Sequence, residues 1–278
     1  MKLLNEWDKS FDNLYVIGID ETGVGDYFSP LISCAVLVEP ESIEKLRLLG
    51  VKDSKKLSDS KIQFLAKEIK KYIKHYKFYK LTPKGYNSLN SFGFNANELK
   101  YISHRSTLNN LIQDLNTKNI KHDLVIIDQY STFNSITKYH IKISEYMQKR
   151  DQKYIDPDVD VLYKTGAESV HIAVACASIL ARNEFLTFMQ NLNEQYGFEF
   201  PLGASNTYKI AETIKKIGSL VRMKSGVVLS EICKLHFLSD EMIKSFISEL
   251  NIKNHFASLE QIDPLLSKEI KKRKNINL

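Results

Sequence analysis

Residues 15–23 read Tyr15-Val16-Ile17-Gly18-Ile19-Asp20-Glu21-Thr22-Gly23. The first five form a short apolar run, which predicts a buried strand over 15–19, and the polar residues and glycine behind it predict a turn. A second apolar run, 31–38, begins after Pro30 and ends at a Glu-Pro pair. These two runs predict neighbouring strands, the first of which ends in two acids.

The rest of the chain alternates between the two kinds of secondary structure. Three more strands are predicted, over 76–81, 124–127 and 159–163. Helices are predicted from the cap Ser58 onward and over 99–115, 168–192, 207–217 and 240–250, and a loop is expected at 147–158. The order predicts an α/β fold with a mixed five-stranded sheet flanked by helices, followed by a C-terminal helical extension.

Composition excludes several classes of protein. The 278 residues are 43% hydrophobic and 26% charged, which is typical of a globular chain and not of a disordered or fibrous one. No apolar run approaches the roughly 18 to 20 residues of a membrane span, and the amino terminus turns polar early, so we expect a cytoplasmic protein. The three cysteines are too scattered for a disulfide framework or zinc site. The net charge of +6 permits a nucleic-acid partner, although a bias toward lysine explains it equally well.

Four acids stand where α/β sheets build their sites. Asp20 and Glu21 end the first strand, Asp128 ends the strand 124–127, and Glu168 opens the most apolar helix. Taken singly, each is explained as a strand end or a helix cap. If folding brings them together, two carboxylates about 4 Å apart repel by roughly 4 kcal/mol at an effective dielectric of 20, so the cluster needs a cation. Oxygen ligands select Mg²⁺ or Mn²⁺, and a pair of such ions indicates phosphodiester hydrolysis.

Two segments nearby suit a phosphate or a sugar. The turn Gly23-Val24-Gly25 follows the acid pair and lets the backbone approach a ligand closely. The run Lys52-Asp53-Ser54-Lys55-Lys56 places positive charge and a hydroxyl before a helix. A solvated loop is the alternative interpretation of that run.

Five blocks of the chain resemble the type 2 ribonucleases H, and their details resemble ribonuclease HIII. They are Asp20 to Pro30, Val51 to Ser58, Ile127-Asp128-Gln129, Ala167-Glu168-Ser169 with 173–182, and Lys234-Leu235-His236-Phe237. The resemblance implies an RNase H-like fold and an endonuclease that cuts the RNA strand of RNA/DNA hybrids, leaving 5′-phosphate and 3′-hydroxyl ends.

The resemblance also implies roles for individual residues. Asp20, Glu21, Asp128 and Glu168 would be the catalytic acids that bind two Mg²⁺ or Mn²⁺ ions. The backbone of Gly23, Val24 and Gly25 would contact the ribose 2′-hydroxyl, and Ser54, Lys55 and Lys56 would hold phosphates.

The chain departs from the ribonuclease HIII pattern at several points. Thr22, Val24 and Ser29 replace the usual residues of the opening motif, and only 19 residues precede Asp20, so the usual amino-terminal domain resembling the TATA-binding protein would be missing. We expect a catalytic domain over 1–237 and a helical, basic extension over 238–278. We hypothesise that the basic tail replaces part of the missing grip on the hybrid; a frayed, solvated terminus is the alternative.

Two other functions stay open on the sequence alone. The altered turn and the missing domain are compatible with a catalytically silent protein that binds RNA/DNA hybrids. An exonuclease or integrase on the same fold would cut DNA instead. We expect a monomer without a membrane partner.

Overall fold

The computed structural model describes residues 1–51, 57–150, 156–223, 226–250 and 255–273, with the side chains of 255–258 left aside. The chain divides into two compact units. The first contains residues 1–22, 32–80 and 96–186, and the second contains 23–31, 81–95 and 187–278. The predicted division at residue 237 stays a prediction.

The first unit is built on a six-stranded mixed sheet with the order β1-β6-β5-β2-β3-β4. β2 runs antiparallel to β3 and parallel to β5, and β6 runs parallel to both β5 and β1. All five predicted strands are present, and the predicted fold class is confirmed. The short β1 is an additional edge strand. The strands are β1 Lys2–Leu4, β2 Val16–Thr22, β3 Leu31–Val38, β4 Tyr76–Leu81, β5 Leu124–Asp128 and β6 Asp160–Lys164.

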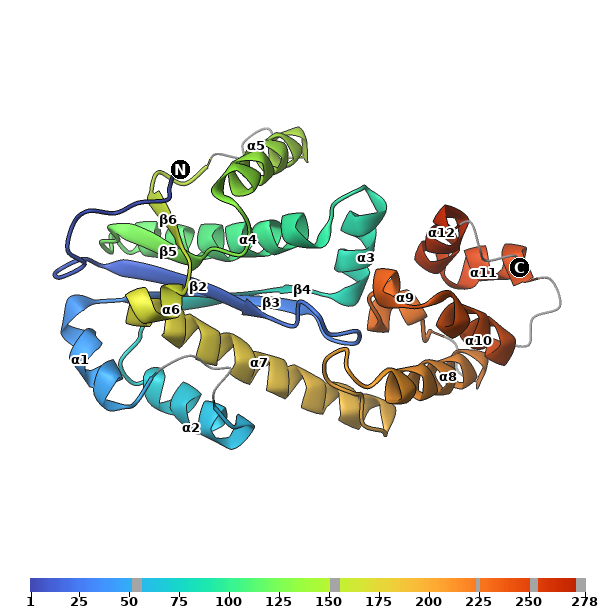
Figure 1. The fold of residues 1–278 in the computed structure, drawn as a ribbon. Coiled ribbons are helices and arrows are strands. Elements are labelled where there is room, and N and C mark those ends of the chain that lie inside the picture. The colour runs from blue at the N-terminus through green and yellow to red at the C-terminus, as the bar shows by residue number, and fades with distance from the viewer. Residues whose placement is uncertain (52–56, 151–155, 224–225, 251–254, 274–278) are drawn as a thin grey trace. The chain divides into compact units, whose positions relative to one another are not determined.

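Helices cover both faces of this sheet (Figure 1). The helices α4 and α5 lie on one face, and α1, α2 and α7 lie on the other. They are α1 Pro40–Leu48, α2 Asp59–Ile69, α4 Ala96–Thr117, α5 Phe133–Arg150, α6 Ala167–Val170 and α7 Ile172–Tyr196. The predicted cap of α2 is confirmed, because the Ser58 side chain accepts a hydrogen bond from the Lys61 N–H. The loop expected at 147–158 is wrong at its start, since α5 continues to Arg150; residues 151–155 lie outside the described part.

The core of the first unit lies between the sheet and α1, α2 and α7. Alternate residues of β2, β3 and β5 point into it, and so do both of the cysteines in this unit, Cys34 and Cys176. Helix α7 is long and apolar enough to cross a membrane by length and composition alone. Its most apolar window is 61% buried inside the protein, as expected of a core helix. All three cysteines are unpaired, as their spacing predicts, and all three are buried.

The second unit is mainly helical. It contains α3 Pro83–Ser91, α8 Thr207–Met223, α9 Leu229–Ile232, the 3₁₀ turn η2 Leu235–Phe237, α10 Asp240–Leu250, α11 His255–Ile262 and α12 Pro264–Lys272. The long helices α8 and α10 pack closely at Gly218, where an added Cβ would lie 2.8 Å from the Glu249 side chain. The two predicted helices over 207–217 and 240–250 are therefore present, the first extended to Met223.

The basic tail is an ordered part of this unit up to residue 273. Leu266 and Ile270 of α12 are buried, and Arg273 donates hydrogen bonds to the main-chain oxygens of Leu235 and Leu238. The interpretation of the tail as a frayed, solvated terminus is therefore wrong for the described residues. Deleting residues 265–278 would remove buried side chains from the core of the unit. The deletion would therefore change stability as well as any binding of nucleic acid by the tail.

Candidate active site

Asp20 and Asp128 come together because their strands are parallel neighbours in register. Ile19 of β2 pairs with Ile127 of β5, so the next residues, the two aspartates, stand side by side where the strand pairing ends. Residues paired in this way point to the same face of a sheet. Both aspartates are half-buried and lie on the face that carries α7.

Helix α7 sits directly on β2 next to these acids. A Cβ added to Gly18 would lie 2.1 Å from the carbonyl carbon of Ala173 and 2.3 Å from the Val174 nitrogen. Only a residue without a side chain permits this approach of helix and strand backbone. Gly18 therefore fixes the start of α7 two residues before Asp20 along the strand.

The short helix α6, which carries Glu168, begins beside Asp128. Asp128 Oδ1 accepts a hydrogen bond of 3.1 Å from the Ala167 N–H, at the first residue of α6. Gly166, which precedes the helix, has a positive φ of 66°. Glu168 follows Ala167 directly and is half-buried, so the chain carries it to the end of β5.

The single helix predicted over 168–192 is wrong at its beginning. His171 has an extended backbone, with φ −145° and ψ 135°, and separates α6 from α7. Its side chain is buried and its Nδ1 accepts from the Ala173 N–H, so it caps α7 as a packed hydrogen-bonding residue. Burial lowers the pKa of His171 to about 4, with the nearby Arg47 charge adding to the effect.

Glu21 turns to the opposite face of the sheet, where α4 lies. Its carboxylate is 2.7 Å from the Lys100 ammonium and 2.7 Å from His104 Nε2, and its side chain is 11% exposed. Burial raises the pKa of Glu21, but the hydrogen bonds and charges of His104 and Lys100 outweigh burial and lower it to about 2. Sequence reasoning missed both partners, because no local pattern ties residues on α4 to the end of β2.

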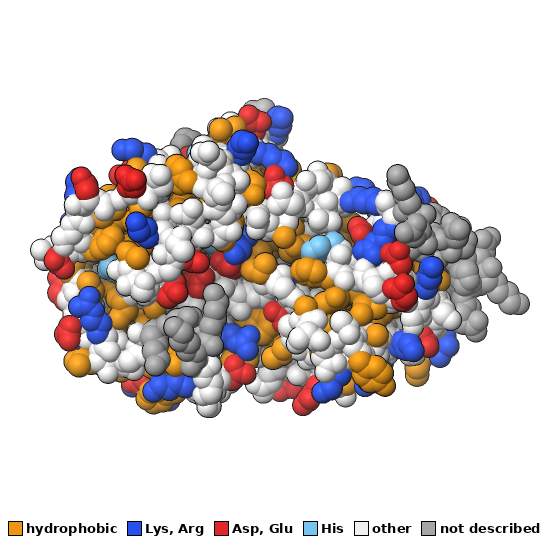
Figure 2. Space-filling model, in the orientation of Figure 1, with side chains coloured by type: hydrophobic (Ala, Val, Ile, Leu, Met, Phe, Trp, Pro, Cys, Tyr) orange, Lys and Arg blue, Asp and Glu red, His pale blue; other side chains and the backbone are white. Residues whose placement is uncertain are grey.

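A recess of about 200 Å³ adjoins the acids within the first unit. It is lined by Asp20, Glu21, Thr22, Leu57, Asp59, Ser178 and Arg182. Arg182 of α7 forms an ion pair of 3.1 Å with Asp59 and brings positive charge to the rim. Figure 2 shows acidic side chains gathered over the region of β2 and the start of α7. The recess is large enough for part of a phosphodiester and offers charges of both signs.

The turn after β2 has the conformation that its glycine predicts. Gly23 has a φ of +81°, and a Cβ there would lie 2.3 Å from the Pro30 oxygen. Val24 is half-buried, and Gly25 is exposed with nothing within 4 Å of an added Cβ. The backbone at Gly25 is thus open to a ligand.

Two other predictions concern neighbouring segments. Tyr27 and Phe28, where stacking on a nucleotide and packing in the core are both compatible with the sequence, are core residues: both are buried within the second unit, where Phe28 packs on Phe200 and Tyr27 on Phe237. The predicted phosphate ligands Ser54, Lys55 and Lys56 lie outside the described residues.

The four predicted acids do not form one ready-made metal centre. Across the described ranges, no group of three or more His, Cys, Asp or Glu side chains is arranged to hold a metal ion. The strand register sets Asp20 beside Asp128, α6 attaches to Asp128 through Ala167, and Glu21 is paired with Lys100 and His104 of α4. The metal-binding and catalytic roles of these residues stay a prediction.

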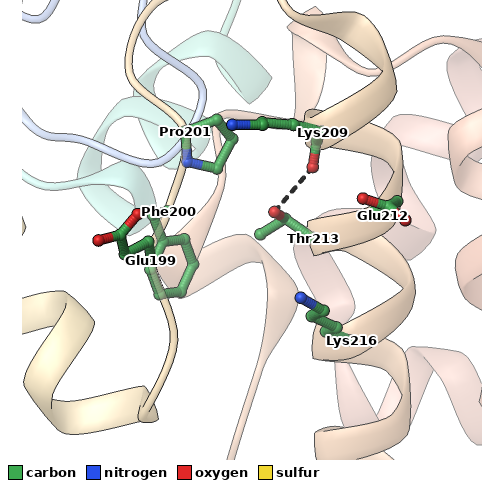
Figure 3. Close-up of a pocket in the computed structure, with 7 residues that line it drawn as sticks. All are labelled: Glu199, Phe200, Pro201, Lys209, Glu212, Thr213 and Lys216. Atoms are coloured by element: carbon green, nitrogen blue, oxygen red, sulfur yellow. Dashed lines mark hydrogen bonds between the residues drawn. The ribbon is translucent and has the colours of Figure 1, made fainter.

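A different cavity, of about 230 Å³, lies wholly within the second unit (Figure 3). It is lined by Glu199, Phe200, Pro201, Lys209, Glu212, Thr213 and Lys216. Two lysines and two glutamates share its rim, so its charges balance. None of the predicted site residues contributes to it.

Comparison with known proteins gives a consistent result. The family model described as Ribonuclease HII matches residues 17–239. A Ribonuclease HIII of Bacillus cereus (strain AH187) is 36% identical over 234 residues, which cover 84% of this chain and 69% of the relative. A Ribonuclease HIII of Staphylococcus saprophyticus is 30% identical over 240 residues, which cover 86% of this chain and 71% of the relative.

Solved structures agree with these relatives. The crystal structure of Bst-RNase HIII in complex with Mn²⁺ is similar with a TM-score of 0.68 at 30% identity, covering 87% of this chain and 71% of the other. Ribonuclease H2 from Pyrococcus horikoshii OT3 is similar in fold, with a TM-score of 0.65 at 21% identity; the match covers 86% of this chain and 100% of the other.

Proposed function

This chain belongs to the ribonuclease HII family and is a ribonuclease H, and on that premise we propose how it acts. We propose that it cleaves the RNA strand of RNA/DNA hybrids by a two-metal-ion mechanism. The products would carry 5′-phosphate and 3′-hydroxyl ends.

The observation that carries the proposal is that Asp20 and Asp128 stand side by side at one end of the sheet, with the backbone next to Glu168 hydrogen-bonded to Asp128. The register of β2 and β5 sets Asp20 beside Asp128, and the hydrogen bond from the Ala167 N–H to Asp128 brings Glu168 to the same end. Residues far apart in the sequence meet there, at the carboxyl ends of parallel strands, where α/β folds bind their ligands.

The donor chemistry of these acids fits Mg²⁺ or Mn²⁺. Asp20, Asp128 and Glu168 offer carboxylate oxygens, which hard divalent cations prefer. When bound, such ions supply Lewis-acid stabilisation of the phosphoryl oxygens and an activated water. For Glu21 to be the fourth ligand, its carboxylate would have to leave Lys100 and His104, or bind them and the metal ion at the same time. Asp20 and Asp128 on the α7 face therefore form the core of the proposed site, which Glu168 from α6 and Glu21 from the other face would join.

The residues around the acids would position the substrate. The open backbone at Gly25, next to Val24 and Gly23, would accept or donate hydrogen bonds at the ribose 2′-hydroxyl, the group that separates RNA from DNA. Arg182 at the rim of the recess would attract a phosphate of the scissile strand. Ser54, Lys55 and Lys56 would hold further phosphates.

A cleavage assay tests the proposal. A hybrid with a labelled RNA strand and the matching DNA duplex are incubated with wild type, Asp20→Asn and Glu68→Gln, each with Mg²⁺ and with Mn²⁺. Glu68, near the end of α2, pairs with Lys71 just beyond the helix and serves as the control acid. We expect wild type and Glu68→Gln to cut only the RNA strand of the hybrid, and Asp20→Asn to lose at least a hundredfold in rate.

The same assay separates the alternatives. Binding of the hybrid without cleavage in both metals would establish a silent binder, and cleavage of the DNA duplex would establish a nuclease of a different specificity. Product ends are read separately: polymerase extension reports the 3′-hydroxyl, and phosphatase-dependent release reports the 5′-phosphate. Products that cannot be extended would contradict the proposed end chemistry.

We further propose that the enzyme acts as a monomer in the cytoplasm with the hybrid as its partner. Size-exclusion chromatography with light scattering tests this: a mass of 32.0 kDa is expected, and a mass of twice that value or more would contradict a monomer.

A further inference from the structure

Lys234 is a lysine whose entire side chain is buried in the second unit, with an exposed fraction of 0%. Buried lysines are rare unless a carboxylate pairs with them. Within the described part of the chain, no ion pair joins Lys234 to an acid. Burial lowers the pKa of Lys234 to about 8, with the Asp26 charge acting in the opposite direction.

The ammonium of Lys234 is bound by the main chain of the turn that follows β2. It donates hydrogen bonds to the carbonyl oxygens of Gly23 and Asp26, the second at 2.9 Å. The backbone N–H of Lys234 donates to the Tyr27 oxygen at 2.8 Å. One residue thus holds three carbonyl groups within five positions of the turn.

The segment that carries Lys234 is itself fixed by α3. The Asn87 side chain donates to the main-chain oxygens of Ser230 at 2.8 Å and Cys233 at 2.7 Å, and it accepts from the Leu235 N–H at 2.9 Å. The Tyr86 ring lies 5.4 Å from the Lys234 ammonium. Because Asn87 and Tyr86 are buried, Lys234 approaches the turn from a rigid base.

We propose that Lys234 is a positioning residue that fixes the backbone of Gly23, Val24 and Gly25 in the shape required to recognise the ribose 2′-hydroxyl. This inference rests on the proposed function, because it assigns that turn to the sugar. Two carbonyl dipoles converge on one ammonium and repel each other without it. Gly23, with its φ of +81°, allows the chain to bend this way but supplies no force that keeps it bent.

The test compares three variants of the full chain. Lys234→Met keeps the length and the apolar stem but removes the donors. Lys84→Met is the matched control, because it removes one positive charge from the same unit, where Lys84 pairs at the surface with Glu231. Ile243→Val removes a methylene group from the core of the unit at α10 and controls for a general loss of stability.

The measured quantity is the ratio of the dissociation constants for a DNA duplex and an RNA/DNA hybrid of the same sequence, determined in EDTA so that no cleavage occurs. We expect Lys234→Met to lower this preference for the hybrid at least tenfold, which corresponds to about 1.4 kcal/mol. Lys84→Met weakens both duplexes equally and Ile243→Val leaves the ratio unchanged. Hydrogen exchange of the peptide amides over 23–31 should rise in Lys234→Met alone.

The outcomes separate this inference from the proposed function. If wild type prefers the hybrid and Lys234→Met keeps that preference within twofold, Lys234 has no positioning role and the inference is overturned. If wild type shows no preference, the assignment of the turn to the sugar fails, and the inference fails with it. If Lys234→Met does not fold, Lys234→Gln replaces it in the test, because glutamine retains an N–H donor on a shorter side chain. The preference of Lys234→Gln for the hybrid must then lie between that of wild type and a tenfold lower value.

Discussion

The substitution Gly18→Ala tests how the sequence seats α7 against the sheet beside the acids. In an open strand this change would stabilise the protein by roughly 0.5–1 kcal/mol, because glycine loses more conformational freedom on folding. At position 18 the added Cβ would lie 2.1 Å from the Ala173 carbonyl carbon and 2.4 Å from its oxygen. Helix backbone cannot rotate away as a flexible side chain can, so strand and helix must separate.

The expected cost is at the upper end of overpacked cores, about 3 kcal/mol. For a protein of this size, each kcal/mol shifts the melting temperature by roughly 2–4 °C, so Gly18→Ala should melt about 6–12 °C below wild type. Cleavage of the hybrid should also fall at temperatures where the variant is folded, because Asp20 stands two residues after Gly18 on the strand that must move away from α7.

The assay is thermal unfolding followed by circular dichroism, with Gly25→Ala as the control for stability. An added Cβ at Gly25 meets nothing within 4 Å, so its melting temperature should stay within about 2 °C of wild type. A melting temperature of Gly18→Ala within about 2 °C of wild type would refute the reasoning, since α7 could not then rest on β2 as described.

Three further predictions concern single side chains. Asp128→Asn keeps an oxygen for the Ala167 N–H, so its free energy of unfolding should stay within about 0.5 kcal/mol of wild type while its cleavage rate falls at least a hundredfold. Asp128→Ala should lose about 1 kcal/mol of stability as well. Equal cleavage rates for wild type and Asp128→Asn would contradict the catalytic role. Glu21 has a folded pKa of about 2 against an ordinary glutamate value of 4.5, so its contribution to stability, at most about 3 kcal/mol, is present above pH 4.5 and is lost as the pH falls toward 2. Urea denaturation should therefore show that the free energy of unfolding changes less between pH 3 and pH 6 in Glu21→Gln than in wild type. An equal change in the two proteins would rule out the depressed pKa of Glu21. Arg273→Ala should destabilise the protein by about 2 kcal/mol in the same denaturation assay, because two main-chain oxygens and two carboxylates lose their donor. Lys272→Gln should leave stability unchanged and weaken binding of the hybrid only at low salt. Weakening that does not depend on salt would argue against phosphate contacts by the basic tail.

The strands and the acids that end them follow from local sequence. The apolar run at 31–38 and the aromatic segment 76–81 define β3 and β4 to the residue, and the runs before Asp20 and Asp128 become the neighbours β2 and β5. Continuous apolar runs are typical of strands covered on both faces, and that condition holds for β3 and for the apolar part of β5. The short strand Lys2–Leu4 has too few residues to give a pattern.

The remaining features depend on contacts between distant segments. The break at His171 lies inside an apolar stretch with good helical periodicity, and the hydrogen bond from Ala167 to Asp128 gives α6 its own orientation. Lys100 and His104 sit on a helix whose sequence gives no sign of an acid on a neighbouring strand. The role of Lys234 was likewise hidden, because a lysine side chain is ordinarily exposed and only the fold shows that this one is buried.

The central claim is that Asp20, Asp128 and Glu168 together bind divalent cations, and calorimetric titration with Mn²⁺ tests it most directly. We expect wild type to bind Mn²⁺ saturably, with affinity at least tenfold lower in Asp20→Asn, in Asp128→Asn and in Glu168→Gln, and unchanged in Glu68→Gln. Titration curves for the three site variants that superimpose on the wild-type curve would contradict the claim.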